Sequence, residues 1–116
     1  MGFLNSLIGI AKSAGIGTTK LEEAKTIAPN SMGCYKIYYN GLKYVGKAED
    51  GLRKRFVQYY NGTTAHYPSA KKIYENRDRI LVSWVVLGSG EKCREVEAQW
   101  IRELKPEWNK QRGWGD

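Results

Sequence analysis

The sequence predicts a small α+β fold in which helices flank a mostly antiparallel, three-stranded sheet. An Asn40-Gly41 pair separates two short tyrosine-containing runs, a pattern typical of a β-hairpin with a type I′ turn. Helical periodicity follows over residues 52–60, 69–76 and 91–104, and an unbroken apolar run, 80–87, precedes the last helix. With 116 residues, of which 41% are hydrophobic, the chain has enough apolar side chains for one modest core.

The first part of the chain is expected to form an N-terminal extension, residues 1–30, ahead of a domain over residues 31–112. Short amphipathic helices are predicted in it, the second over residues 20–27 behind a Thr19/Glu22 capping box. Residues 1–17 carry apolar side chains at helical spacing and are a candidate docking segment for a partner protein, a membrane surface or the domain itself. Because this run is too short to span a bilayer and lacks the basic start of a signal peptide, we expect a cytoplasmic protein with no membrane span.

The hairpin places several tyrosines on one face of the sheet. Counting outward from the turn pairs Tyr39 with Leu42, Ile37 with Tyr44, and Tyr35 with Gly46. Because side chains alternate along a strand, Tyr35 and Tyr44 share a face and lie roughly 7–8 Å apart as diagonal neighbours. The glycine opposite Tyr35 leaves space beside its hydroxyl. A tyrosine-rich hairpin is also common as plain packed sheet, so the segment that follows decides its interpretation.

That segment is a helix over residues 52–60, which begins after Glu49-Asp50-Gly51 ends the strand. Leu52, Phe56 and either Tyr59 or Tyr60 are spaced to face the core. Arg55 and Tyr59 are four residues apart and therefore adjacent on the helix surface. The sequence thus presents an arginine and a third tyrosine beside a hairpin that already carries two tyrosines and Lys47.

The apolar run 80–87 is expected to be a central strand buried on both faces, and the helix over 91–104 buries a stripe of Val96, Trp100 and Leu104. Glu97 lies at the border of this stripe, whereas Glu95 lies on the solvated face. A carboxylate at an apolar border requires a partner, because an unpaired buried charge is costly. The helix alone favours a salt bridge to Arg94 or Arg102; the neighbouring hairpin favours a divalent cation, since one or two carboxylates with water suffice for Mg²⁺.

Charge and cysteine content limit the class of partner. The chain has 19 Lys and Arg against 12 Asp and Glu, a net charge of +7 and a pI near 9.5, which suits a polyanion. Many of the basic residues, among them Lys54, Lys71 and Lys72, fall between residues 47 and 79. Two isolated cysteines, Cys34 and Cys93, and a single histidine exclude a zinc finger and suggest a reducing compartment.

Three blocks together resemble the GIY-YIG nuclease superfamily. They are Gly33-Cys34-Tyr35 and Tyr44-Val45-Gly46, then Lys47, Arg55 and Tyr59, and finally a late helix with Glu97 that Asn109 closes. Residues 44–60 are especially similar to the incision domain at the start of bacterial UvrC. The resemblance spans roughly residues 32–110. Cys34 departs from the isoleucine of the family's first triad, but its side chain is expected on the face opposite Tyr35.

The resemblance implies a metal-dependent endonuclease that hydrolyses phosphodiester bonds, with DNA favoured, and leaves 5′ phosphate and 3′ hydroxyl ends. Tyr35 is expected to be the general base, with Tyr44 bonding to it or substituting for it, while Lys47 and Arg55 supply positive charge. Glu97 would hold one Mg²⁺ or Mn²⁺, and Tyr59 would orient a phosphate oxygen or the water. His66 is a secondary catalytic candidate; Lys54, Lys71, Lys72 and Asn109 are candidate nucleic-acid contacts.

Two alternatives stay open. One is a module that binds nucleic acid and has lost hydrolysis, although such a module has no need of a lone border carboxylate. The other is a toxin or mobile-element nuclease acting on single-stranded DNA or RNA, in which the chemistry is the same and the biology differs.

Overall fold

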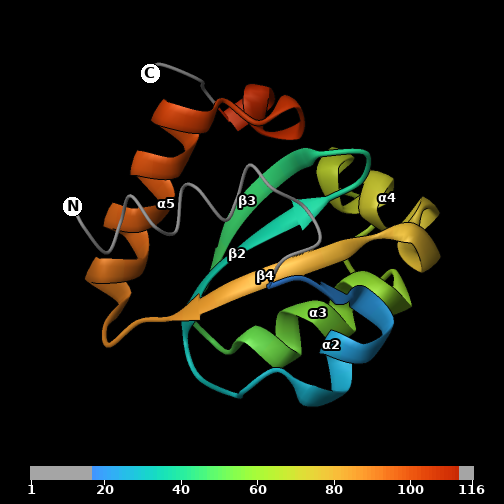
Figure 1. Ribbon diagram of the computed structural model, residues 1–116, viewed down its shortest axis with the longest axis horizontal. Coiled ribbons are helices and arrows are strands. Elements are labelled where there is room, and N and C mark those ends of the chain that lie inside the picture. The colour runs from blue at the N-terminus through green and yellow to red at the C-terminus, as the bar shows by residue number, and fades with distance from the viewer. Residues whose placement is uncertain (1–16, 113–116) are drawn as a thin grey trace.

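An antiparallel sheet forms the centre of the computed structural model, which describes residues 17–112 (Figure 1). Within those residues four strands lie in the order β1-β4-β2-β3. The elements along the chain are β1 (Thr19–Lys20), α2 (Leu21–Ile27), β2 (Gly33–Tyr38), β3 (Leu42–Ala48), α3 (Leu52–Asn61), α4 (Pro68–Glu75), the 3₁₀ turn η1 (Arg77–Arg79), β4 (Leu81–Val86), α5 (Gly90–Leu104) and the 3₁₀ segment η2 (Glu107–Arg112). The α+β class is confirmed, and each of the four later helices and strands lies within two residues of its prediction.

The sheet has one strand more than expected. Thr19 pairs with Val82 and Lys20 with Leu81, so β1 extends the sheet beyond β4. With Thr19 in a strand, the predicted capping box does not form; α2 begins after Lys20 without a side-chain cap. Before the expected boundary at residue 30, β1 joins the sheet, and the α2 residues Leu21 and Ala24 are completely buried. The proposed docking segment, residues 1–17, lies outside the described residues apart from Gly17.

The hairpin has the predicted register over most of its length. Tyr35 lies opposite Gly46 and Ile37 opposite Tyr44, and both turn residues, Asn40 (φ 55°) and Gly41 (φ 99°), take positive φ. The prediction that Tyr39 faces Leu42 is wrong: Tyr38 does, after a register shift between Ile37 and Tyr38. As a result Leu42 packs on the other face of the sheet from Tyr35.

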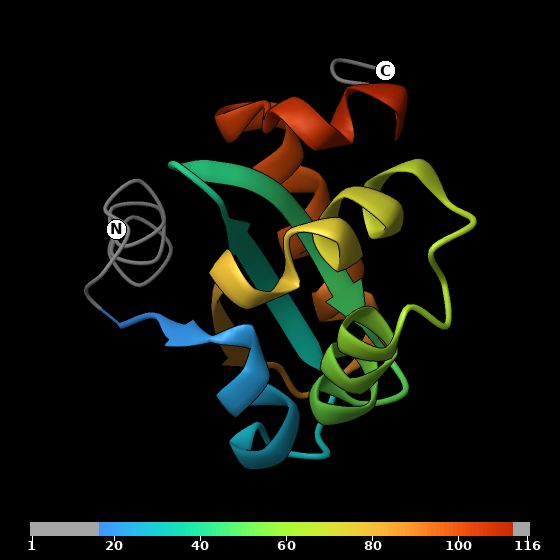
Figure 2. The same cartoon turned by 90° about the vertical axis from the view of Figure 1, so that its right-hand side faces the viewer.

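Two cores, one on each face, fix the positions of the helices (Figures 1 and 2). On one face α2, α3 and α4 cover a large cluster that includes Tyr35, Ile37 and Phe56. On the other face α5 packs Val96 and Trp100 against β2 and β3. Because β3 is the outermost strand on its side, side chains from both layers can meet around its edge.

The strand β4 lies between β1 and β2, as a central strand should, but it is not buried on both faces as expected. Val82 is fully buried, whereas Val86 at the end of the strand is 50% exposed. The two-residue β1 pairs with Leu81 and Val82, at the beginning of β4. Across residues 17–112, no helix combines the length and apolar character that crossing a membrane requires.

Candidate active site around the edge of β3

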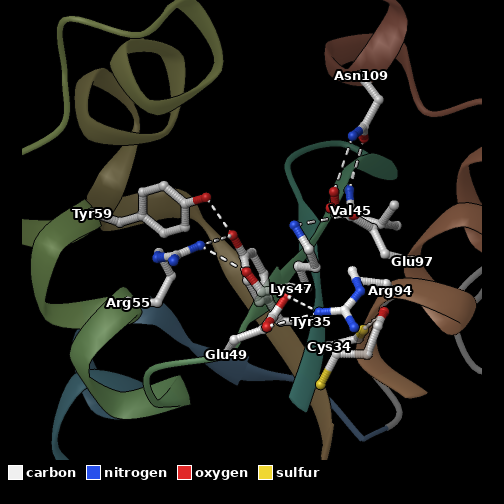
Figure 3. Close-up of polar contacts among 11 residues, drawn as sticks. Cys34, Tyr35, Val45, Lys47, Glu49, Arg55, Tyr59, Arg94, Glu97 and Asn109 are labelled. Atoms are coloured by element: carbon white, nitrogen blue, oxygen red, sulfur yellow. Dashed lines mark hydrogen bonds and ion pairs between the residues drawn. The ribbon is translucent and has the colours of Figure 1, made fainter. Parts of the chain in front are cut away.

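Two side chains bond to the outer edge of β3, which has no neighbouring strand (Figure 3). Asn109 of η2 accepts a hydrogen bond from the Val45 amide (2.8 Å) and donates one to the Val45 carbonyl (3.0 Å). Two residues further on, the Lys47 carbonyl accepts a hydrogen bond from Nη1 of Arg55 (2.9 Å). These bonds satisfy backbone groups that an edge strand would otherwise leave open to another chain.

Arg55 also joins a buried pair of tyrosines. Its Nη1 donates to the hydroxyl of Tyr35 (3.2 Å), which shares a 2.5 Å hydrogen bond with the hydroxyl of Tyr59. Nη2 of Arg55 lies 3.5 Å from a carboxylate oxygen of Asp50. The guanidinium is therefore held by β3, a tyrosine and a carboxylate while about a quarter of its side chain (27%) stays exposed. The predicted grouping of Arg55 and Tyr59 with the hairpin tyrosines is present.

Tyr35 is poorly placed to accept a proton from water. It is 1% exposed, and its hydroxyl lies directly over Gly46, where a Cβ atom would collide with it. Burial raises the pKa of Tyr35 and nearby Tyr44 raises it further, while Arg55 and the bond to Tyr59 oppose the shift only in part. The space expected beside this hydroxyl is thus filled by the tyrosine itself, and the geometry disfavours Tyr35 as the general base.

Glu97 approaches the same strand from the α5 side. It is 8% exposed, in agreement with its predicted place at the apolar border, and its Oε1 lies 3.9 Å from Nζ of Lys47. The partners expected from the helix alone were Arg94 or Arg102; Arg94 instead pairs with Glu49 at 3.2 Å. Lys47 therefore connects the two layers, since its carbonyl meets Arg55 and its ammonium meets Glu97.

The donor set around Glu97 fits a hydrated divalent cation. Among residues 17–112 there is no group of three or more His, Cys, Asp and Glu side chains that would enclose a metal. Glu97 is thus not part of a ligand group of that size, and its contact to Lys47 is long at 3.9 Å. Mg²⁺ commonly binds through one or two carboxylates, with water and substrate phosphate completing its octahedron.

A hollow of about 600 Å³ opens beside this network. Tyr44, Arg55 and Tyr59 line it, so the second hairpin tyrosine reaches the open space that Tyr35 does not. The rings of Tyr35 and Tyr44 are 6.4 Å apart between centroids, close to the predicted diagonal spacing. Tyr44, itself only 3% exposed, is the hairpin tyrosine positioned to meet a bound molecule.

The remaining predicted residues divide into exposed and structural ones. Lys54, Lys71 and Lys72 are exposed, Lys54 with an ion pair to Asp50 at 3.3 Å. His66 is exposed on the loop after α3, with its ring 4.2 Å from that of Tyr67. Asn109, a predicted nucleic-acid contact, is completely buried, and both atoms of its amide are bonded to the Val45 backbone.

Among the residues that line the hollow, sequence reasoning did not single out Gln58 and Tyr67. A signal for Gln58 existed, because it is three residues after Arg55 and hence on the same side of the helix. Tyr67 gave none, since the fold of the loop between α3 and α4 decides where its ring points.

A basic, tyrosine-rich site with one border carboxylate at a strand edge defines a class of domain suited to phosphate chemistry. Residues 31–112 match the family model described as the GIY-YIG catalytic domain. The chain belongs to the GIY-YIG family, and this region is a catalytic domain of the endonuclease type.

Known relatives carry the same domain. UvrABC system protein C of Mycobacteroides abscessus is 32% identical over 83 residues, and that of Beutenbergia cavernae 29%; each match covers 70% of this chain and 12% of the relative. The chain thus spans about an eighth of the length of these relatives. The N-terminal endonuclease domain of UvrC from Thermotoga maritima, solved bound to magnesium as its catalytic divalent cation, superposes with a TM-score of 0.64. It is 25% identical, and the match covers 78% of this chain and 96% of that one.

Proposed function

We propose that this chain is a metal-dependent endonuclease that hydrolyses phosphodiester bonds in DNA. The observation that carries the proposal is the meeting of Arg55, two tyrosines, Lys47 and Glu97 around one strand edge, next to a hollow. The net charge of +7 is suited to a polyanionic substrate. The magnesium-bound UvrC domain supports Mg²⁺ as the cation, and we extend the proposal to Mn²⁺ because the same oxygen ligands suit it.

Hydrolysis of a phosphodiester requires an activated water, positive charge at the phosphoryl oxygens and support for the leaving 3′ oxygen. We assign the first task to Tyr44, because it lines the hollow and Tyr35 does not. A tyrosine accepts a proton only where positive charge stabilises its phenolate, and Arg55 lines the same hollow.

Arg55 would also bind the phosphoryl oxygens through its planar guanidinium. Tyr35 and Tyr59 hold that guanidinium in place, one directly and one through the shared hydroxyl bond. Glu97 would hold the cation, which when bound supplies positive charge for the leaving oxygen. Lys47 lies between Glu97 and Arg55 and would contact the phosphate from the strand side. We also propose a cytoplasmic location, which the two free cysteines support.

Two variants on one helix test the proposal. Glu97→Gln removes the ligand charge at constant size and should lower Mg²⁺-dependent cleavage by about 10²-fold or more, comparable to the loss of one preorganised group in other enzymes. Glu95→Gln is the matched control, because Glu95 is exposed and pairs with Lys92 at 3.5 Å. Cleavage of labelled duplex and single-stranded DNA would be followed with Mg²⁺, with Mn²⁺ and with EDTA.

Equal effects of the two substitutions, or cleavage that persists in EDTA, would contradict the metal assignment. Binding without cleavage under any of these ions would instead favour the non-catalytic module.

A further inference from the structure

The hollow beside Arg55 extends well beyond the groups that the chemistry needs. Its other walls come from the loop between α3 and α4, the first turn of α4, and Trp108 of η2. At about 600 Å³ it has the size of a site for a small molecule, for which about 300–1,000 Å³ is usual. A single phosphate group would leave most of this volume unused.

The walls combine aromatic surface with a few polar groups. Tyr67 stands at the hollow with 59% of its surface exposed, an unusual exposure for a large aromatic ring, and the His66 ring lies against it. Trp108 contributes an indole, and Gln58 offers both a donor and an acceptor. The hydroxyl oxygen of Thr64, buried in the wall, has no hydrogen-bond partner among the described residues. This is the chemistry that a flat, polar-edged heterocycle requires.

The charge around the hollow favours a nucleotide over a neutral ligand. Among the described residues that line it, Arg55 is the one charged side chain, and it is a cation. On α4, Lys71 and Lys72 are exposed, and Nζ of Lys72 lies 5.8 Å from the ring centroid of Trp108. A ligand with an aromatic base in the hollow and phosphates toward Arg55 and these lysines matches this distribution.

We infer that the hollow receives the base of the nucleotide joined to the phosphate that Arg55 binds, with Tyr67 as its stacking platform. The inference rests on the proposed function and specifies its substrate class. A base inside a duplex is paired and stacked and cannot enter such a hollow without being extruded, which costs a few kcal/mol. The substrate is therefore DNA that is single-stranded or locally unpaired at the cleavage position.

Binding without chemistry tests the inference directly. A labelled oligo-dT strand and a strand of the same length built from abasic residues would be titrated in EDTA and followed by fluorescence anisotropy. Tyr67→Ala should weaken binding of oligo-dT about tenfold, a typical effect of losing one base-stacking ring, and leave the abasic strand unchanged. Tyr67→Phe keeps the ring and should bind both strands as the wild type does.

Ile27→Ala is the matched control, because Ile27 is similarly exposed (61%) but lies on α2 and does not line the hollow. Melting temperatures of all variants confirm folding. If Tyr67→Ala weakens binding of both strands equally, or of neither, the inference is overturned, because the hollow then does not bind a base.

Cleavage provides a second, separate readout. A fully paired duplex and the same duplex with an unpaired bubble would be compared with Mg²⁺ present. The wild type should prefer the bubble, and Tyr67→Ala should remove most of that preference. Equal cleavage of the two duplexes by the wild type would overturn the inference while leaving the endonuclease intact. Absence of all cleavage would overturn the proposed function, and the anisotropy titration would still decide the role of the hollow.

Discussion

Replacing Arg55 by lysine separates charge from geometry at the centre of the site. The guanidinium makes three contacts, to the Lys47 carbonyl at 2.9 Å, the Tyr35 hydroxyl at 3.2 Å and the Asp50 carboxylate at 3.5 Å. A lysine keeps the positive charge, but its single ammonium on a flexible stem cannot reproduce a planar fork that meets these acceptors together. The substitution therefore removes preorganisation and leaves the net charge unchanged.

The structure sets the size of the expected effect. The guanidinium's two hydrogen bonds, to the Lys47 carbonyl and the Tyr35 hydroxyl, contribute about 1.5–3 kcal/mol each, whereas the ion pair to the half-exposed Asp50 carboxylate adds little. If the lysine ammonium keeps one of these two hydrogen bonds, the loss of stability should be about 2 kcal/mol. For a domain of about this size that corresponds to a melting temperature lower by roughly 8–16 °C. If Arg55 binds charge that develops in the transition state, single-turnover cleavage should fall by about 10²–10³-fold while DNA affinity changes little.

Arg53→Lys is the control for this prediction. Arg53 is on the same helix, is also partly buried, and donates from Nε to the Ala28 carbonyl at 2.7 Å, which lies outside the site. It should lose some stability and retain its turnover. Near wild-type turnover by Arg55→Lys, measured below its melting temperature, would show that Arg55 has only a structural role and would remove the main support for the proposed chemistry.

Two further predictions concern binding and pH. Replacing Lys71 and Lys72 together by alanine should flatten the slope of log K for DNA binding against log salt concentration by up to about 2, since each phosphate contact releases counterions. The Lys20/Lys25 double variant is the control and should keep the wild-type slope. A flattened slope in both double variants would contradict phosphate contacts on α4. Lys36 is 2% exposed, and burial lowers its pKa to about 8. Between about pH 8 and 10 the unfolded chain therefore binds more protons than the folded one, and the free energy of unfolding rises with pH. The Lys36→Met variant lacks this titration, so subtracting its free energy of unfolding from that of the wild type at each pH should isolate the rise, which totals on the order of 3 kcal/mol. A difference that stays constant with pH would contradict the prediction.

The parts of the fold that followed from the sequence depend on local chemistry. Positive φ at Asn40 and Gly41 and strand alternation place Tyr35 opposite Gly46, and the stripe of Val96 and Trp100 places Glu97 at an apolar border. These patterns are set within a few residues and need no knowledge of the rest of the chain.

The features that were missed depend on distant partners. The two-residue β1 has no pattern of its own and exists because β4 offers it an edge. Asn109 resembled a nucleic-acid contact, but its amide replaces a missing strand beside Val45. Tyr35 was predicted as a general base without knowledge of its burial against α3, because spacing along a strand does not report exposure.

The position of the site at the edge of β3 links its chemistry to both cores. Arg55 and the tyrosines come from the layer of α3, whereas Glu97 comes from α5 on the opposite face. The groups that would bind the phosphate and the group that would hold the cation are therefore positioned by independent packing, and β3 is the element they share.

Because the Lys47 carbonyl bonds Arg55 and its ammonium faces Glu97, a displacement of this strand moves both halves of the site together. The Asn109 bonds that hold the middle of β3 thus stabilise the geometry of the site without contacting a substrate.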